Sequence, residues 1–205
     1  MNKKPKYLLI LIVYLCVLIS GALSACSEPY ENQKTGLSGN YFVTYADRNG
    51  TIFIVARFED ELFTKVSLSQ PNTYLEKAYY PTDSGWEVFL KNGDMWLNYG
   101  TEENLDNAIS AILNPVVQGT EKINSGTAKK TGETSSKLAS GAFEGKSVSE
   151  YSDFDTGESY WVLDGYGIIY TAHTQNDVFT LAEYYPNINE QTFRSYCMPA
   201  RSEID

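Results

Sequence analysis

Two Asn-Gly pairs constrain the fold more than any other feature of the sequence. Asn49-Gly50 and Asn92-Gly93 each stand between two short runs that are rich in β-branched and aromatic residues. Asn-Gly between such runs is a strong β-hairpin signal, because both residues tolerate the positive φ angles of a tight turn. The four runs are residues 41–45, 51–55, 86–90 and 95–97. The sequence therefore predicts antiparallel strands in the first half of the chain.

Further strand signals extend this pattern toward the C-terminus. Residues 62–68 alternate apolar and polar side chains, and we expect about four to six strands before residue 100. Three more runs of strand-forming residues follow at 159–163, 167–171 and 178–182. About 40 strand-rich residues bury too little surface to form an independent domain, so we expect them to complete the first sheet.

One segment, Glu102–Leu113, has the pattern of an amphipathic helix. Thr101 is placed to cap its N-terminus, its apolar residues recur at helical spacing, and Pro115 is expected to end it. Its single apolar face should lie on the sheet. The fold class that follows is α+β and strand-dominated, with a single antiparallel curved sheet and one helix packed on it.

The first 26 residues have the order of a lipoprotein export signal. Three lysines and no acidic residue precede an almost uninterrupted apolar run from Tyr7 to Leu23, as in a secretory signal peptide. The run ends in Leu23-Ser24-Ala25-Cys26, which resembles the lipobox of bacterial lipoproteins. The resemblance implies that residues 1–25 are removed and that Cys26 is acylated. An uncleaved membrane anchor and cleavage without lipidation are the alternatives.

Acylation of Cys26 would place the protein on the extracytoplasmic face of a cell membrane or outer membrane. Several acyl chains hold a protein stably, at about 0.8 kcal/mol per buried CH₂ group. Ser27 stands where an Asp favours inner-membrane retention, so the outer membrane is expected in a host with two. The net charge of −10 argues against a nucleic-acid partner, which requires clustered Lys and Arg. The sequence identifies no protein partner.

The remaining sequence divides by composition. Residues 26–38 are polar and read as a tether. Residues 39–190 are expected to form the antiparallel β domain, interrupted by a long polar loop at 118–150 that is rich in Gly, Ser, Thr and Lys. Residues 191–205 are a C-terminal segment without an assigned structure.

Residue patterns typical of catalysis or metal binding are scarce. The chain has one histidine, His173, and no Gly-x-Ser-x-Gly motif. Zinc needs three or four N or S ligands, and after acylation of Cys26 only His173 and Cys197 remain. We therefore expect no metal and no cofactor, and we interpret Cys197 as a small, partly buried residue. The segment Asp153–Glu158 resembles the start of a calcium loop but fits a hairpin turn better.

Aromatic residues are dense in the predicted strands, and 28 residues of the chain are Tyr, Phe or Trp. Either the rings fill the concave face of the sheet beneath the helix, or they line a groove for an apolar or amphipathic ligand. For the second reading, the candidate ligand-binding residues are Tyr80, Trp86, Trp96, Tyr160, Trp161 and Tyr170.

The order of these features resembles one family. A lipobox, a polar tether, an Asn-Gly hairpin that bears Trp86 and Trp96, a helix, a polar loop and the strands of residues 160–184 resemble the LolA-like group of extracytoplasmic lipoproteins. The resemblance implies a sheet curled into an incomplete barrel that is closed by helices, with a cavity for acyl chains or other apolar cargo. It is a resemblance of rhythm over residues 40–186, and it assigns no site residue beyond Cys26.

The sequence thus predicts a non-enzymatic, membrane-anchored lipoprotein that binds an apolar small molecule or lipid. An envelope protein-interaction or structural lipoprotein is the alternative, and an exposed aromatic patch on the convex face would favour it. A hydrolase is less expected, because it would need two carboxylates, or a paired His173, converging in a pocket.

Overall fold

The computed structural model describes residues 36–68, 70, 72–135, 146–173 and 178–204. The predicted export signal and Cys26 lie outside these residues. The first strands are β1 (Tyr41–Ala46), β2 (Ile52–Phe58), β3 (Glu61–Ser67), β4 (Tyr74–Thr82), β5 (Gly85–Asn92) and β6 (Met95–Glu102). The later strands are β7 (Lys129–Ser135), β8 (Ser147–Ser152), β9 (Ser159–Leu163), β10 (Gly167–Ala172) and β11 (Thr180–Pro186). Helix α2 (Leu105–Ser125), helix α3 (Glu190–Tyr196) and a 3₁₀ turn (Arg201–Glu203) complete the described elements.

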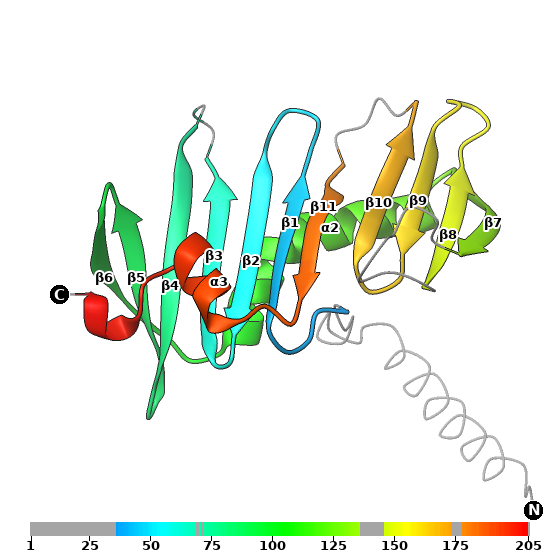
Figure 1. The fold of residues 1–205 in the computed structure, drawn as a ribbon. Helices are drawn as coiled ribbons and strands as arrows, with labels where there is room; N and C mark the ends of the chain where they lie inside the picture. Colours follow the sequence, from blue (N-terminus) through cyan, green and yellow to red (C-terminus); the bar gives the residue numbers. More distant parts are fainter. Residues whose placement is uncertain (1–35, 69, 71, 136–145, 174–177, 205) are drawn as a thin grey trace, which may run out of the picture. The chain divides into compact units, whose positions relative to one another are not determined.

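The described strands form one curved, unclosed sheet of 11 strands in the order β6-β5-β4-β3-β2-β1-β11-β10-β9-β8-β7 (Figure 1). The expected α+β, strand-dominated class is confirmed, and so are both Asn-Gly hairpins. Gly50 and Gly93 adopt φ angles of 81° and 62°, which an L side chain rarely adopts. The six strands before α2 are at the upper end of the expected number.

The last strands complete the first sheet, as expected. β11 pairs antiparallel with β1 from Tyr41–Pro186 to Ala46–Thr180. In contrast, β10 and β11 share a single bridge, Ile168 with Thr180, and this bridge is parallel. The sheet therefore has two parts, which we call the β1 flank (β1–β6 and β11) and the β9 flank (β7–β10).

The core lies on both faces of the sheet, because the two helices cover opposite faces (Figure 1). On one face, α2 packs over aromatic and aliphatic residues of the β1 flank. These include Tyr41, Val43, Tyr45, Val55, Leu62, Tyr79 and Val88. On the other face, α3 and the residues after it cover a second cluster. This cluster includes Ala56, Phe63, Ala78, Tyr80 and Phe89, with Phe193, Met198 and Ile204 from the C-terminal segment.

Helix α2 is longer than the sequence predicted. Asn104, not Thr101, is the N-cap, and its side-chain oxygen accepts the backbone N–H of Asp106 at 2.8 Å and of Asn107 at 3.3 Å. Pro115 lies inside the helix and does not end it. A proline in a helix interior costs about 3 kcal/mol, but the turns that follow it bury Val116 and Ile123 against the sheet. Burial of these residues offsets the cost.

The prediction of a long polar loop at residues 118–150 is wrong for most of these residues. The last turns of α2 and the strands β7 and β8 occupy much of it, while residues 136–145 lie outside the described part. The sequence of β7 has the polar composition of a linker because β7 is an edge strand. It pairs on one side with β8, from Lys129–Ser152 to Ser135–Ser147. An edge strand needs few apolar residues.

The expected boundaries of the domain are also too narrow. Gly36 donates its N–H to the carbonyl of Gly165 at 2.6 Å, and Leu37 packs on the core, so the folded body includes the end of the predicted tether. At the other end, residues 191–205 are not an appendage. Phe193 is fully buried, and the Arg194 guanidinium pairs with the Glu61 carboxylate. This segment contains α3, so the structure has a second α-helix, whereas the sequence predicted only one helix.

Candidate functional site

The structure does not bring the six candidate aromatic residues together. Tyr80 is buried beneath the C-terminal segment, where its hydroxyl donates to the Pro199 carbonyl at 2.7 Å. Trp96 packs at the margin of the same cluster. Trp86 packs on the α2 face instead, and its indole N–H donates to the Asp60 carbonyl at 2.9 Å. These three rings lie on two faces of the sheet, so they do not share one binding surface.

The other three candidates lie on the β9 flank. Tyr160 is buried beside Ile123 of α2. Trp161, the next residue along the strand, points to the opposite face, where its ring meets that of Tyr170 edge-on at 5.0 Å between centroids. Of the six, only Tyr160 lines either of the two pockets described below.

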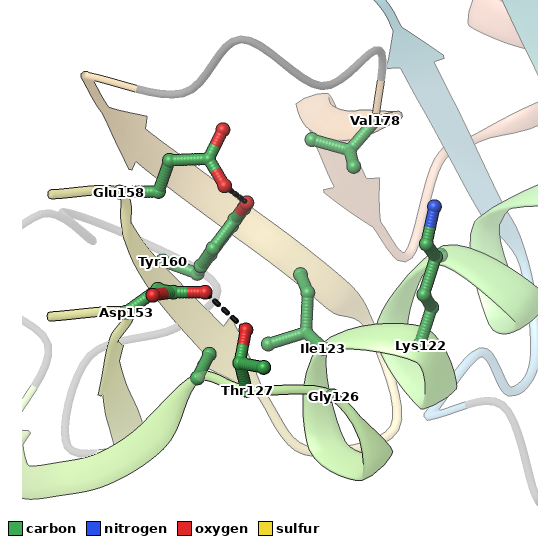
Figure 2. Close-up of a pocket in the computed structure, with 10 residues that line it drawn as sticks. Lys122, Ile123, Gly126, Thr127, Asp153, Glu158, Tyr160 and Val178 are labelled. Atoms are coloured by element: carbon green, nitrogen blue, oxygen red, sulfur yellow. Dashed lines mark hydrogen bonds between the residues drawn. The ribbon is translucent and has the colours of Figure 1, made fainter. Parts of the chain in front are cut away.

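The first pocket lies at the C-terminal end of α2 and has a volume of about 270 Å³. Figure 2 shows side chains from the helix end and from the β8–β9 turn directed into it. We call it the α2 C-terminal pocket. Its lining includes Lys122, Ile123, Thr127, Asp153, Glu158 and Tyr160.

Asp153 is buried in this pocket by the turn that it helps to form. One carboxylate oxygen accepts the backbone N–H groups of Asp155 at 2.9 Å and Thr156 at 3.2 Å, and the other accepts the Thr127 hydroxyl. The hydrogen bond from Thr127, followed by those from the two amides, lowers the pKa of Asp153. The carboxylate thus ties the end of α2 to the β8–β9 turn. The interpretation of residues 153–158 as a hairpin turn is confirmed.

Glu158 is the second buried carboxylate of the pocket, with 5% of its surface exposed. It accepts the Tyr160 hydroxyl at 2.9 Å (Figure 2). Two carboxylates in one pocket meet the condition that the sequence set for a hydrolase. Both of them already accept hydrogen bonds from the protein, however, and those bonds give them a structural role in the turn.

The second pocket has a volume of about 250 Å³ and lies between the first half of α2 and strands β3, β4 and β6. We call it the α2 groove. Its apolar lining is Val66, Leu75, Tyr79, Ala108, Ala111 and Ile112. Its polar lining is Thr64, Lys77, Glu102 and Asn107. An apolar wall with a few polar groups is the usual composition of a small-molecule site.

The polar groups of the α2 groove differ in their surroundings. Burial raises the pKa of Tyr79, so its phenol stays neutral at physiological pH. The Lys77 ammonium lies 4.7 Å from the centroid of the Tyr99 ring, which is within cation–π range. The groove therefore offers an apolar interior and a cationic group held beside an aromatic ring.

Sequence reasoning missed the α2 groove because its residues come from elements that it did not recognise in full. Leu75 and Lys77 belong to β4, which carries no turn signal as strong as Asn-Gly. Ala108 and Ile112 belong to the single apolar helix face that the sequence predicts, and nothing in their spacing separates the part of that face on the core from the part beside it. Side chains alternate between the two faces of a strand, so applying this rule to residues 74–80 could have placed Leu75, Lys77 and Tyr79 on one wall of the groove.

Two residues of reactive type, Cys197 and His173, line neither of these pockets. Cys197 is buried beside α3, and burial raises the pKa of its thiol to about 12, so its thiolate is scarce at neutral pH. Cys197, which the sequence predicts to be partly buried, is buried. His173 follows β10 and has a φ angle of 58°.

Comparisons with protein-family models, with curated proteins and with solved structures found no match. Among the described residues, no helix combines the length and the apolar character needed to cross a bilayer.

Proposed function

We propose that this chain is a bacterial lipoprotein, anchored through lipid on Cys26 to the extracytoplasmic face of a cell membrane or outer membrane, and that its body binds an apolar or amphipathic ligand without catalysis. The anchor rests on the lysine-rich start, the apolar run and the Leu-Ser-Ala-Cys sequence that ends at Cys26. The LolA-like resemblance is part of the same proposal.

The observation that carries the binding proposal is the α2 groove. Its volume of about 250 Å³ is slightly below the range of small-molecule sites, which begins at about 300 Å³. A groove of this size holds one ring or a short stretch of acyl chain. Lys77 and Glu102 both line the groove, and we propose that the acidic head group of a fatty acid or a similar amphipathic acid binds at Lys77.

The location of the groove changes how such a ligand would bind. The rings of Tyr41, Tyr45 and Tyr79 are buried between α2 and the sheet, so aromatic side chains fill the region that a hollow barrel would keep open. The ligand is therefore proposed to lie beside α2, against β3 and β4.

Filling the groove tests this proposal. Ala111 is exposed and lines the groove, so Ala111→Trp should occupy the space without disturbing the core. We expect the chain from Ser27 onward to bind an apolar fluorescent fatty acid, and Ala111→Trp to weaken binding at least tenfold. Gln118→Trp is the matched control, because Gln118 is exposed on the same helix and lines neither described pocket. An unmodified protein that ignores the probe, or equal losses in both variants, would contradict the binding proposal.

The anchor is tested separately in cells. Cys26→Ala should remove the acylation site, so the protein should lose incorporation of labelled fatty acid and leave the membrane fraction. Full retention in the membrane fraction without label would show that the apolar run of residues 7–23 is itself the anchor.

A further inference from the structure

Strand β6 contains a β-bulge near the α2 groove. The pairing of β5 with β6 shifts register between Val88 and Phe89, which leaves Tyr99 as an extra residue of β6. A bulge bends its strand and redirects nearby side chains, and bulges are frequent at sheet edges and next to functional sites. Among the described strands, β6 is an edge strand of the sheet. The direction of the Tyr99 side chain is therefore set by this irregularity and not by regular pairing alone.

The ring of Tyr99 lies over a lysine of the groove that is two strands away. β5 separates β6 from β4, yet the Lys77 ammonium is 4.7 Å from the centroid of the Tyr99 ring. This distance is within cation–π range. Tyr99 is 63% exposed, so its side chain buries little apolar surface and contributes little to the core. Its contact with Lys77 can therefore be removed without emptying a core position.

Lys77 has no acidic partner within the described part of the chain. Its side chain is half-buried in the wall of the groove, and it forms no ion pair with a described carboxylate. Glu102, which also lines the groove, instead accepts the backbone N–H of Asn104 at 3.4 Å. Partial burial of a charge is unfavourable unless a neighbouring group compensates for the lost water. The Tyr99 ring supplies part of this compensation, and an anionic group of a ligand would supply more.

We propose that Tyr99 is a positioning residue that makes the α2 groove prefer amphipathic acids to uncharged amphiphiles of the same shape. The ring holds the Lys77 ammonium at the groove before a ligand binds, so less side-chain entropy is lost when a carboxylate binds there. Without the ring, the flexible stem of the lysine moves among several rotamers and its charge is less well placed. This inference rests on the proposed function of the groove and adds the residue that sets its charge preference.

Four variants separate the ring contact from other effects. Phenylalanine keeps the ring of Tyr99, whereas leucine keeps apolar bulk but has no π face, so Tyr99→Phe and Tyr99→Leu isolate the cation–π contact. Met95→Ala is the matched control, since Met95 is 62% exposed on the same strand and pairs with Asn92 at its other end. Lys77→Gln removes the cation and gives the preference of a groove without it.

The test compares two ligands that differ only in their polar end. 4-Phenylbutyrate and 4-phenylbutanol share one ring and a short alkyl chain, and the acid is ionised at neutral pH. Titration calorimetry measures both dissociation constants on the full protein in lipid discs, with empty discs as the blank. We expect the unmodified protein to bind the acid about tenfold more tightly than the alcohol. Tyr99→Leu should lower this ratio about two- to fivefold, while Tyr99→Phe and Met95→Ala should preserve it.

An acid-to-alcohol ratio that is unchanged in Tyr99→Leu overturns the inference. So does an equal weakening of both ligands, because Tyr99 would then act through the shape of the groove and not through Lys77. A loss in Tyr99→Phe or in Met95→Ala equal to that in Tyr99→Leu also overturns it, since the ring would then have no special role. An unmodified protein that binds both ligands without preference overturns only this inference, whereas one that binds neither contradicts the proposed function of the groove as well.

Discussion

The β1 flank and the β9 flank are both built from hairpins, yet they are stabilised in different ways. The β1 flank has a helix on each face, with α2 on one side and α3 on the other. In the β9 flank, Ile123 at the end of α2 packs on Tyr160, Val162 and Ile168, while Tyr170 on the opposite face is 48% exposed. A single parallel bridge joins the two flanks along the sheet.

The comparison shows that side-chain packing, more than backbone pairing, couples the flanks. Helix α2 packs on both of them, and Tyr166 in the β9–β10 turn packs on Leu181 and Tyr184 of β11. The first three turns of α2 bury Leu105, Ile109 and Leu113 on the β1 flank, and Ile123 near its end is buried on the β9 flank. Gly167, at the start of β10, allows α2 to pack close to this strand, since a Cβ at this position would lie 3.1 Å from a methyl carbon of Val116. We therefore expect the β9 flank to open at a lower free energy than the β1 flank.

The largest effect is expected from Leu113→Ala. Leu113 is fully buried between α2 and the β1 flank, and removing such a side chain costs about 2–5 kcal/mol of the free energy of unfolding. Because α2 couples the flanks, amide hydrogen exchange should accelerate in both of them. Denaturant unfolding measures the change in the free energy of unfolding. Asn114→Ala, at an exposed position of the same helix, is the control. A loss confined to the β1 flank would show that α2 does not couple them.

A smaller and more local effect is expected from Gly167→Ala. The φ angle of Gly167 is 96° and the added methyl group would press on Val116, so we expect a loss of about 1–3 kcal/mol. Gly157→Ala is the matched control, since Gly157 has a φ angle of 74° but nothing within 4 Å of the added carbon. Amide hydrogen exchange that becomes faster in β8–β10 and stays unchanged in β1–β3 would show that the contact between Gly167 and α2 stabilises the β9 flank alone. Equal losses in the two variants would show that the contact with α2 contributes nothing.

The smallest effect is a pH dependence confined to the β9 flank. The folded-state pKa of Asp153 is lowered, chiefly by the Thr127 hydroxyl. Its contribution to stability is therefore fully present above its ordinary pKa, about 4, and is lost as the pH falls through the lower folded-state value. The protection of the β8–β9 amides against hydrogen exchange, relative to the intrinsic rate at each pH, should decrease as the pH falls below about 4, and Asp153→Asn should flatten this decrease.

Asp47→Asn is the control for that experiment, because the Asp47 carboxylate accepts two backbone N–H groups in the β1–β2 turn, at 2.9 and 2.8 Å. It should leave the β8–β9 exchange unchanged. A β8–β9 profile that is the same for Asp153→Asn as for the unmodified chain would refute the assigned role of this carboxylate.

Local signals predicted the hairpins well, because an Asn-Gly turn and its flanking strands depend on a few neighbouring residues. Asn92-Gly93 identified β5 and β6, and the runs of strand-forming residues at 159–163 and 167–171 identified β9 and β10. The end of α2 was not predictable in this way. Pro115 is a strong local stop, and only the burial of Val116 and Ile123 by distant strands overrides it.

The sites were less predictable than the fold, because they depend on which residues of different elements meet. Tyr80 and Trp86 stand six residues apart and on opposite faces of the sheet, in environments that composition does not separate. The polar sequence of β7 gave no sign of pairing, since an edge strand gains its partner from β8. Asp153 was visible as a turn residue, but its bond to Thr127 at the helix end was not.

The closure of β1 by β11 has a consequence for the order in which the chain matures. Thr180 of β11 hydrogen-bonds to the Ala46 carbonyl across 134 positions, and the cluster on the α3 face is completed by Phe193, Met198 and Ile204. A nascent chain leaving the ribosome holds β1 with one side unpaired until almost all of it has been synthesised. Throughout that interval one edge of the half-made sheet stays open, so the native fold can be completed only after the C-terminal segment has been synthesised.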